Sequence, residues 1–242
     1  MEPERYLTSL RSDADVLAET ARRDLTGRVP SCPHWSVEDL VVHVLQVYRH
    51  KTACIRLGHN PDPWPPPVPP GHPVDAMQAA VAELTAELVE RGPGAPSYTW
   101  HEPDQTVGFW YRRMAQETAV HRVDAELAFG PPGPIDADIA TDGVAEVLDI
   151  MLAGDWSDLA QPGPIRTVLL EAGGSTWLVR MTPTEVAVST MQDAAAVDAT
   201  LTGDPDALLL WLWGRQDLAA LRVDGDPAAA RALRTRLELV TQ

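Results

Sequence analysis

Two histidines and one glutamate in the first half of the sequence stand where apolar side chains are expected. Glu117 and His121 are four residues apart, so on a helix they lie one turn apart on the same face. His43 lies on an earlier stripe of the same kind. A buried carboxylate costs free energy unless a cation or strong donors compensate it. A His₂Glu set can bind Zn²⁺ and leave its fourth position open, which is the pattern of catalytic zinc sites.

A metal is not the only explanation of these residues, because His43 can pair with Glu117 while His121 packs nearby. In the metal interpretation, two carboxylates are placed to orient the imidazoles through hydrogen bonds. Asp39 lies four residues before His43, and Asp124 lies three residues after His121. Zn²⁺ is favoured by the ligand types, although such a set accepts several divalent ions. The sequence thus predicts a divalent site, with a hydrogen-bonded core as the alternative.

His50 and Arg113 are our candidates for catalytic work. His50 lies seven residues after His43, two turns along the same face, and could be a fourth ligand, an acid or base on the substrate side, or a surface histidine. Arg113 or its neighbour Arg112 could bind a substrate carboxylate with two hydrogen bonds. The alternative for either arginine is an ion pair at the surface.

Four amphipathic helices must position these residues. Apolar residues recur at spacings of three and four in four stretches, as on helices that bury one face. The four stripes are Leu7, Leu10, Ala14, Leu17 and Ala21; Leu40, His43, Val47, His50 and Cys54; Met77, Val81, Leu84 and Leu88; and Trp110, Met114, Glu117, His121 and Asp124. They predict a four-helix bundle, a fold whose core can hold metal sites.

Two local signals mark the connections within this bundle. Ser36 and Asp39 have the spacing of a capping box, which begins a helix by satisfying its first backbone N–H groups. In the segment 61–73, eight of the thirteen residues are proline. Proline fixes φ and lacks an N–H, so we expect a stiff, extended crossover there.

The second half has a different periodicity. The segment 130–134 is rich in Pro and Gly, so we expect the bundle to occupy residues 1–130 and a small α+β domain to occupy 131–242. A helix is expected over 141–152, and Gly173 and Gly174 predict a hairpin turn between the first two strands. Asp204 and Asp226, each followed by proline, are expected to cap helices. The expected strands cover 165–170, 177–181, 185–189, 199–202 and 221–223.

Composition narrows the partners and the compartment. The net charge of −16, with a single lysine, argues against nucleic acids and anionic membranes, which attract basic surfaces. No apolar stretch reaches the roughly 18 residues that a membrane span needs, and the acidic start lacks a signal-peptide pattern. Two cysteines do not make a disulfide framework, so we expect a cytoplasmic protein. P-loop, dinucleotide-binding, serine-hydrolase and His-Glu-x-x-His motifs are absent from the sequence.

Three stretches resemble a known family. CPHWSVEDLVVH (32–43) and FWYRRMAQETAVHRVDAE (109–126) are similar to two motifs of the mycothiol-dependent maleylpyruvate isomerase family, part of the DinB-like superfamily. DATLTGDPDALLLWLWGR (198–215) resembles the C-terminal domain of that family, which has a sterol-carrier-protein-like fold. The resemblance implies that His43, Glu117 and His121 bind zinc, and that mycothiol or a similar thiol is the cosubstrate.

The resemblance also implies a type of chemistry. A metal at the open position favours a thiolate over a thiol, and the thiolate is the nucleophile. It could add to an activated double bond and leave after rotation, which is isomerisation, or displace a leaving group, which is S-transfer. A non-catalytic metal sensor or a small-ligand-binding protein is the alternative. The chain departs from the family at Tyr48, where relatives often carry histidine. The catalytic arginine of the family's C-terminal domain has no assigned counterpart among Arg166, Arg180, Arg215 and Arg222.

Overall fold

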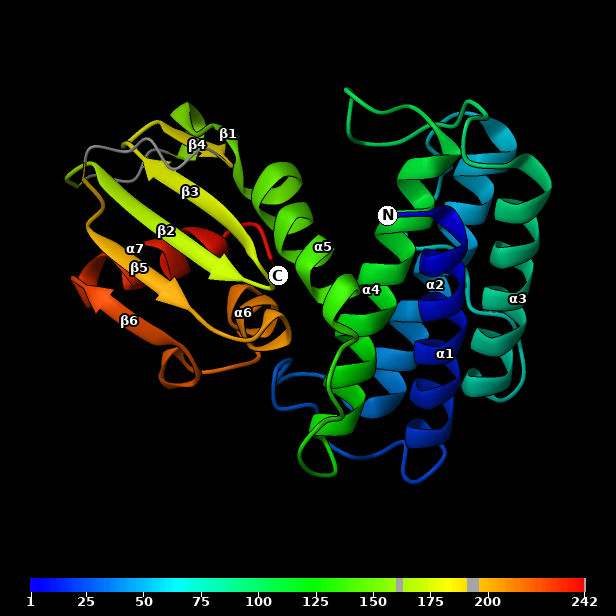
Figure 1. The fold of residues 1–242 in the computed structure, drawn as a ribbon. Coiled ribbons are helices and arrows are strands. Elements are labelled where there is room, and N and C mark those ends of the chain that lie inside the picture. Colours follow the sequence, from blue (N-terminus) through cyan, green and yellow to red (C-terminus); the bar gives the residue numbers. More distant parts are fainter. Residues whose placement is uncertain (160–162, 191–195, 242) are drawn as a thin grey trace. The chain divides into compact units, whose positions relative to one another are not determined.

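The computed structural model describes residues 1–159, 163–190 and 196–241 and divides the chain into two compact units (Figure 1). Unit 1 is Met1–Gly133 and unit 2 is Pro134–Gln242. The division falls within the segment 130–134, whose prolines and glycines end the helical pattern of the first half.

Unit 1 is a bundle of four helices, as the apolar stripes predict. They are α1 (Pro3–Ala21), α2 (Val37–Leu57), α3 (Pro73–Arg91) and α4 (Val107–Leu127). α1 packs along α4, and α2 packs along α3. The core between them includes Leu10, Leu17, Leu40, Leu84 and Met114.

Both ends of α2 are set by local chemistry, which fixes the rotation of the residues that this helix carries. The predicted capping box is confirmed: the backbone N–H of Ser36 donates to Asp39 Oδ2 at 2.8 Å, and the N–H of Asp39 donates to Ser36 Oγ at 3.2 Å. At the other end, Gly58 adopts φ +70°, and its N–H donates to the carbonyl of Cys54. This left-handed conformation ends many helices, and glycine adopts it without steric cost.

The proline-rich segment lies along α2. As expected, residues 58–72 form neither helix nor strand. Two side chains of α2 donate hydrogen bonds to proline carbonyls of this segment: Gln46 Nε2 to Pro66 O at 2.9 Å and Arg49 Nη1 to Pro67 O at 2.7 Å. The prolines cannot donate, but their carbonyl groups still accept, and these bonds fasten the crossover to the bundle.

Unit 2 is a mixed sheet with helices, and this confirms the predicted class. The sheet order is β1-β4-β3-β2-β5-β6; β2 and β5 are parallel and the other neighbours are antiparallel. α7 packs against β2 and β5. The elements are α5 (Ala137–Glu146), β1 (Gly154–Asp155), β2 (Arg166–Ala172), β3 (Ser175–Met181), β4 (Glu185–Ser189), β5 (Ala199–Thr202), α6 (Pro205–Leu212), β6 (Arg222–Gly225) and α7 (Pro227–Leu237).

The turns, caps and helices of unit 2 follow the sequence predictions with two exceptions. Gly173 and Gly174 have φ +58° and +77° and join β2 to β3 in a two-residue turn, as predicted. Asp226 caps α7 by accepting the N–H of Ala228 at 2.8 Å. Asp204 makes no such bond at the start of α6, so that expected cap is wrong.

The second exception is the helix expected over 141–152. It begins earlier, as α5, and its last part, Val147–Leu152, is π-helical. β1 has only two residues and was not expected, because two residues show no alternation. Among the described residues, no helix combines the length and the apolar character that crossing a membrane requires.

Candidate metal centre

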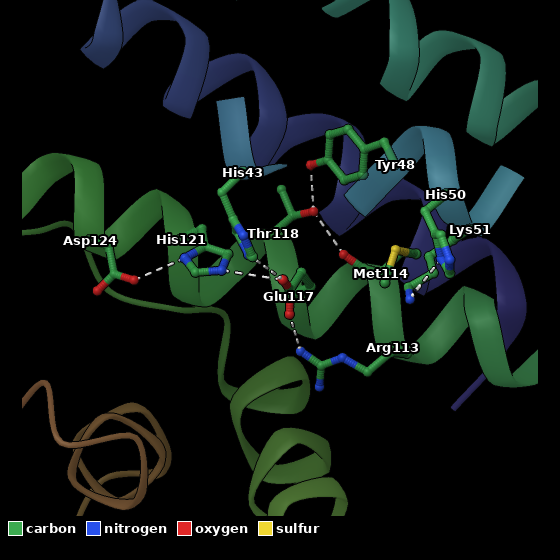
Figure 2. A network of polar contacts seen from close by, with 10 residues as sticks. All are labelled: His43, Tyr48, His50, Lys51, Arg113, Met114, Glu117, Thr118, His121 and Asp124. Carbon is green, nitrogen blue, oxygen red and sulfur yellow. Dashed lines mark hydrogen bonds and ion pairs between the residues drawn. The ribbon is translucent and has the colours of Figure 1, made fainter. Parts of the chain in front are cut away.

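His43, Glu117 and His121 converge in the core of unit 1. α2 carries His43, and α4 carries the other two one turn apart. Glu117 Oε1 lies 3.5 Å from His43 Nε2 and 3.2 Å from His121 Nε2. Figure 2 shows the three side chains pointing toward one another from the two helices. One potential ligand atom from each side chain lies within 4.8 Å of the others. A single ion can therefore be reached by all three after small side-chain rotations.

His121 is oriented by a buried carboxylate. Its Nδ1 lies 2.9 Å from Oδ2 of Asp124, whose other oxygen accepts a hydrogen bond from Ser31 Oγ at 2.5 Å. In neutral His121 the proton on Nδ1 donates to Asp124, so the lone pair of Nε2 faces Glu117 and His43. This carboxylate–histidine pair is the usual support of a metal-binding histidine. The orienting role expected for Asp124 agrees with this geometry.

Glu117 divides its two oxygens between an arginine and the histidines. Arg113, one turn earlier on α4, donates from Nη2 to Oε2 at 2.6 Å. Oε1 is left facing the two imidazoles. Arg113 is only 4% exposed, so the ion pair that it makes lies inside the bundle and not at the surface. The structure therefore brings Arg113 to the centre as the partner of Glu117.

His43 is the most accessible member of the group. Its side chain is 29% exposed, against 17% for Glu117 and 11% for His121. The ring of Trp35 packs beside it with 4.9 Å between centroids, and the His121 ring lies 5.1 Å away on another side. Of the three side chains, that of His43 is therefore the one most exposed to solvent.

Two family models cover most of the chain. The model of the mycothiol maleylpyruvate isomerase N-terminal domain matches residues 8–126, and the model of the MDMPI C-terminal domain matches residues 138–232. The chain belongs to the mycothiol-dependent maleylpyruvate isomerase family. Both parts of the predicted resemblance are confirmed by these matches.

The fold of the chain is similar to that of solved structures. A crystal structure of the mycothiol-dependent maleylpyruvate isomerase matches with a TM-score of 0.61 and 12% identity over 93% of each chain. A mutant of that enzyme, in which a histidine is replaced by alanine, gives the same values. No curated protein matches the sequence. At this identity the likeness establishes the fold, and the chemistry must be argued from the residues of this family member.

The electrostatics of the centre favour a cation between the three side chains. Burial alone would raise the pKa of Glu117, but His121, His43 and Arg113 hold it well below its usual range. Burial would likewise lower the pKa of His121, yet Glu117 and Asp124 raise it to about 9. Both pKa shifts show that positive charge is favourable between these side chains. Two imidazoles with one carboxylate are also a usual donor set for Zn²⁺. The residues present therefore fit a divalent ion.

The structure does not bring His50 to this centre. Figure 2 places it apart from the three converging side chains, and among the described residues it is not part of the ligand group. His50 is 5% exposed, so the alternative of a surface histidine is wrong. Its Nδ1 lies 3.1 Å from Lys51 Nζ, and its ring lies 4.8 Å from the ring of Trp64. Burial and the charge of Lys51 lower the pKa of His50 to about 4, so the ring is neutral at neutral pH.

Two residues near the expected ligands have other partners than we expected. Asp39 bonds to both the hydroxyl and the N–H of Ser36, so it caps α2 and does not orient His43. Tyr48, where the family often has histidine, is fully buried, and its hydroxyl lies 2.7 Å from that of Thr118. Tyr48 thus links α2 to α4 through Thr118.

Three contributors were missed from the sequence. Ser31 donates to Asp124, and Trp35 packs on His43; both lie at or beside the first family motif, which was the available signal. Lys51 lies with its Nζ 5.2 Å from the ring centroids of both Trp64 and Trp110. Lys51 could have been singled out from the sequence, because it is the only lysine of the chain and follows His50 directly.

Proposed function

We propose that the chain is a metal-dependent enzyme that uses a low-molecular-weight thiol, such as mycothiol, as an isomerase or S-transferase acting on a small electrophile. The observation that carries this proposal is the convergence of His43, Glu117 and His121, with Asp124 and Arg113 fixing two of them. The thiol and the isomerase chemistry are supported by the family, whose solved member is described as mycothiol-dependent maleylpyruvate isomerase.

In this proposal His43 Nε2, His121 Nε2 and Glu117 Oε1 hold Zn²⁺. When bound, the ion supplies Lewis acidity, which favours the thiolate form of the cosubstrate over the thiol. Asp124 holds the proton at Nδ1 of His121 and thereby keeps Nε2 available. Arg113 is a positioning residue that acts through Glu117, because its bond to Oε2 sets which oxygen faces the histidines.

His50 and Lys51 are proposed to serve the substrate side together. Neutral His50 accepts a hydrogen bond from the Lys51 ammonium group and so orients it. Lys51 is partly buried, and its pKa is lowered by burial while it interacts with the charges of Glu117 and Arg113. A cation in this position favours an electrophile that carries a carboxylate.

The alternative of a metal sensor differs from the enzyme in the fourth coordination position, which an enzyme needs open. A sensor would tolerate four protein ligands, for example with His50 as the fourth. Among the described residues the converging group has three members, and His50 packs against Trp64 instead. An open fourth position favours the enzyme.

The first test is the zinc content of gently purified protein by elemental mass spectrometry. We expect about one zinc per chain and its loss in His121→Ala, because one of three ligands is removed. The matched control is His59→Ala, which alters an exposed histidine of the loop after α2 and should keep the metal. Zinc-loaded protein is then screened for turnover of electrophilic substrates with mycothiol.

The zinc content and the turnover of the variants decide between the enzyme and a hydrogen-bonded core. Turnover that is lost in His43→Ala and Glu117→Ala, with the helical fold retained by circular dichroism, supports the enzyme. If the wild-type protein binds no zinc even when zinc is offered, the centre is a hydrogen-bonded core and the enzyme proposal is wrong. Normal turnover in both ligand variants would equally overturn it.

A further inference from the structure

Unit 2 contains a pocket of about 240 Å³ between α7 and the neighbouring ends of β2 and β3. Its apolar wall includes Met181 from the end of β3 and Ala228 and Ala232 from successive turns of α7. Two arginines, Arg166 and Arg236, also line it. An apolar pocket with a few polar groups is the general form of a small-molecule site, and this volume suits a small ligand.

Arg236 is a buried cation that no carboxylate of the described residues neutralises. It is 6% exposed, and its guanidinium group lies 5.0 Å from the ring centroid of Trp156. Nη2 donates to the carbonyl of Thr182, whereas Nη1 is buried with no hydrogen-bond partner among the described residues. A buried donor without an acceptor costs free energy, and a buried charge without a counter-charge costs more.

Comparison with the other arginines makes this one exceptional. The other two buried arginines of the described chain are paired: Arg113 with Glu117, and Arg122 with Glu126 and Asp13. Within the pocket, Arg166 pairs with Asp198 and Asp226 at 3.3 and 3.2 Å. No carboxylate of the described residues pairs with Arg236, and burial lowers its pKa. Among the residues that the structure describes, Arg236 is therefore the pocket arginine whose charge is not compensated.

We infer that this pocket binds a small organic acid, with the ligand carboxylate bonded to Arg236 and its apolar part against Met181, Ala228 and Ala232. A monoanion matches the site better than a phosphate dianion, because the second arginine is already neutralised by two aspartates. Guanidinium groups bind carboxylates with charge-assisted hydrogen bonds. The site belongs to unit 2 and does not depend on the metal proposed in unit 1.

The test titrates the full-length protein with benzoate and with its uncharged isostere benzamide, followed by ¹H–¹⁵N NMR. Benzoate should bind saturably, and benzamide should bind at least about tenfold more weakly, since loss of a charge-assisted hydrogen bond of about 1.4 kcal/mol gives that factor. Arg236→Met should weaken benzoate binding by a similar factor. Arg231→Met, the same substitution at an exposed position of α7, should leave it unchanged.

A second variant keeps the test decisive if Arg236→Met folds poorly. Ala232→Leu fills the pocket from α7 without touching the charge, and it should also abolish benzoate binding. The inference is overturned if benzoate does not saturate, or if it binds equally to Arg236→Met. It is also overturned if binding is lost only in His121→Ala, because the acid would then be bound at the metal centre.

Discussion

At the scale of the residue, Glu117 is the side chain on which the metal centre depends. One of its oxygens is occupied by Arg113, and the other faces both histidines. The carboxylate can therefore offer an ion one oxygen in a fixed direction. Preorganisation of this kind usually depends on the partners of the ligands as much as on the ligands.

Arg113→Met is expected to weaken zinc binding about 10- to 100-fold, the usual effect of losing the partner of a metal ligand. Without the guanidinium group, Glu117 can rotate away from the histidines. Competition with a chromophoric chelator measures the affinity, and Arg91→Met, which removes an exposed partner of Glu87 on α3, is the control. An unchanged zinc affinity in Arg113→Met would refute a positioning role.

His50 should make the stability of the protein depend on pH. Its pKa is about 4 in the folded chain and near 6.5 in an unfolded one, so the unfolded state binds more protons between these values. Stability is then fully present above pH 6.5 and falls as the pH decreases towards 4. The groups that face the ring are Lys51, Cys54 and Trp64, with the backbone of Pro61 and the side chain of Asn60.

Urea unfolding at pH 7 and pH 5 checks this expectation for wild type and His50→Gln. The variant should lose less stability between the two pH values, because glutamine does not titrate. Other groups contribute equally to both proteins, so the difference isolates His50. Identical losses in the two proteins would mean that His50 is not held neutral by its surroundings.

Arg236→Met should change the free energy of unfolding by less than about 1 kcal/mol, because removal of an uncompensated buried charge offsets the lost contacts. Arg122→Met is the contrasting case. It leaves Glu126 and Asp13 without their cation, and a loss of about 3–5 kcal/mol is expected. Denaturant midpoints compare the two variants. A similar large loss in both would show that Arg236 is a structural residue.

At the scale of the element, the proline-rich segment shields one side of α2. Gln46 and Arg49 fasten it, and Trp64 covers His50 and Lys51 although the tryptophan itself is 51% exposed. Because Lys51 is the only lysine, its modification by an amine-reactive reagent can be followed at one position by peptide mass spectrometry.

Trp64→Ala should increase the modification rate of Lys51 several-fold, since it removes the ring that covers the ammonium group. Trp100→Ala is the matched control, because Trp100 is also partly exposed, at 44%, but packs on Phe109 and His101. Equal rates in the wild type and Trp64→Ala would mean that the segment does not protect the lysine.

The elements of the bundle could be predicted because helical spacing determines which residues share a face. That is why Glu117 and His121 could be assigned to one face, and His43 to a second helix. The same reasoning did not predict the contacts of His50 and Asp39. Spacing gives the face of a residue, but Trp64 and Ser36, which come from neighbouring loops, decide their contacts. The pocket around Arg236 could not be predicted, since it depends on which turn of α7 meets the end of β3.

At the scale of the whole molecule, the two units carry independent proposed sites. Zinc should raise the melting temperature through unit 1, and benzoate through unit 2, because a ligand stabilises the folded state that binds it. His121→Ala should abolish only the zinc effect, and Arg236→Met only the benzoate effect. Differential scanning fluorimetry of the wild type and the two variants checks all four combinations. Loss of both effects in one variant would contradict the assignment of the sites to separate units.

The ligands of the metal centre come from distant parts of the chain. His43 and Glu117 are separated by 74 positions (117 − 43), and the proline-rich segment lies between them. A bound ion would therefore act as a cross-link that closes a long loop, much as a disulfide does, and such closure restrains the unfolded chain. Unit 1 has no covalent bridge, since Cys32 and Cys54 are both free. A chain cut by a protease between residues 58 and 72 would then keep its two pieces together for as long as the ion remained.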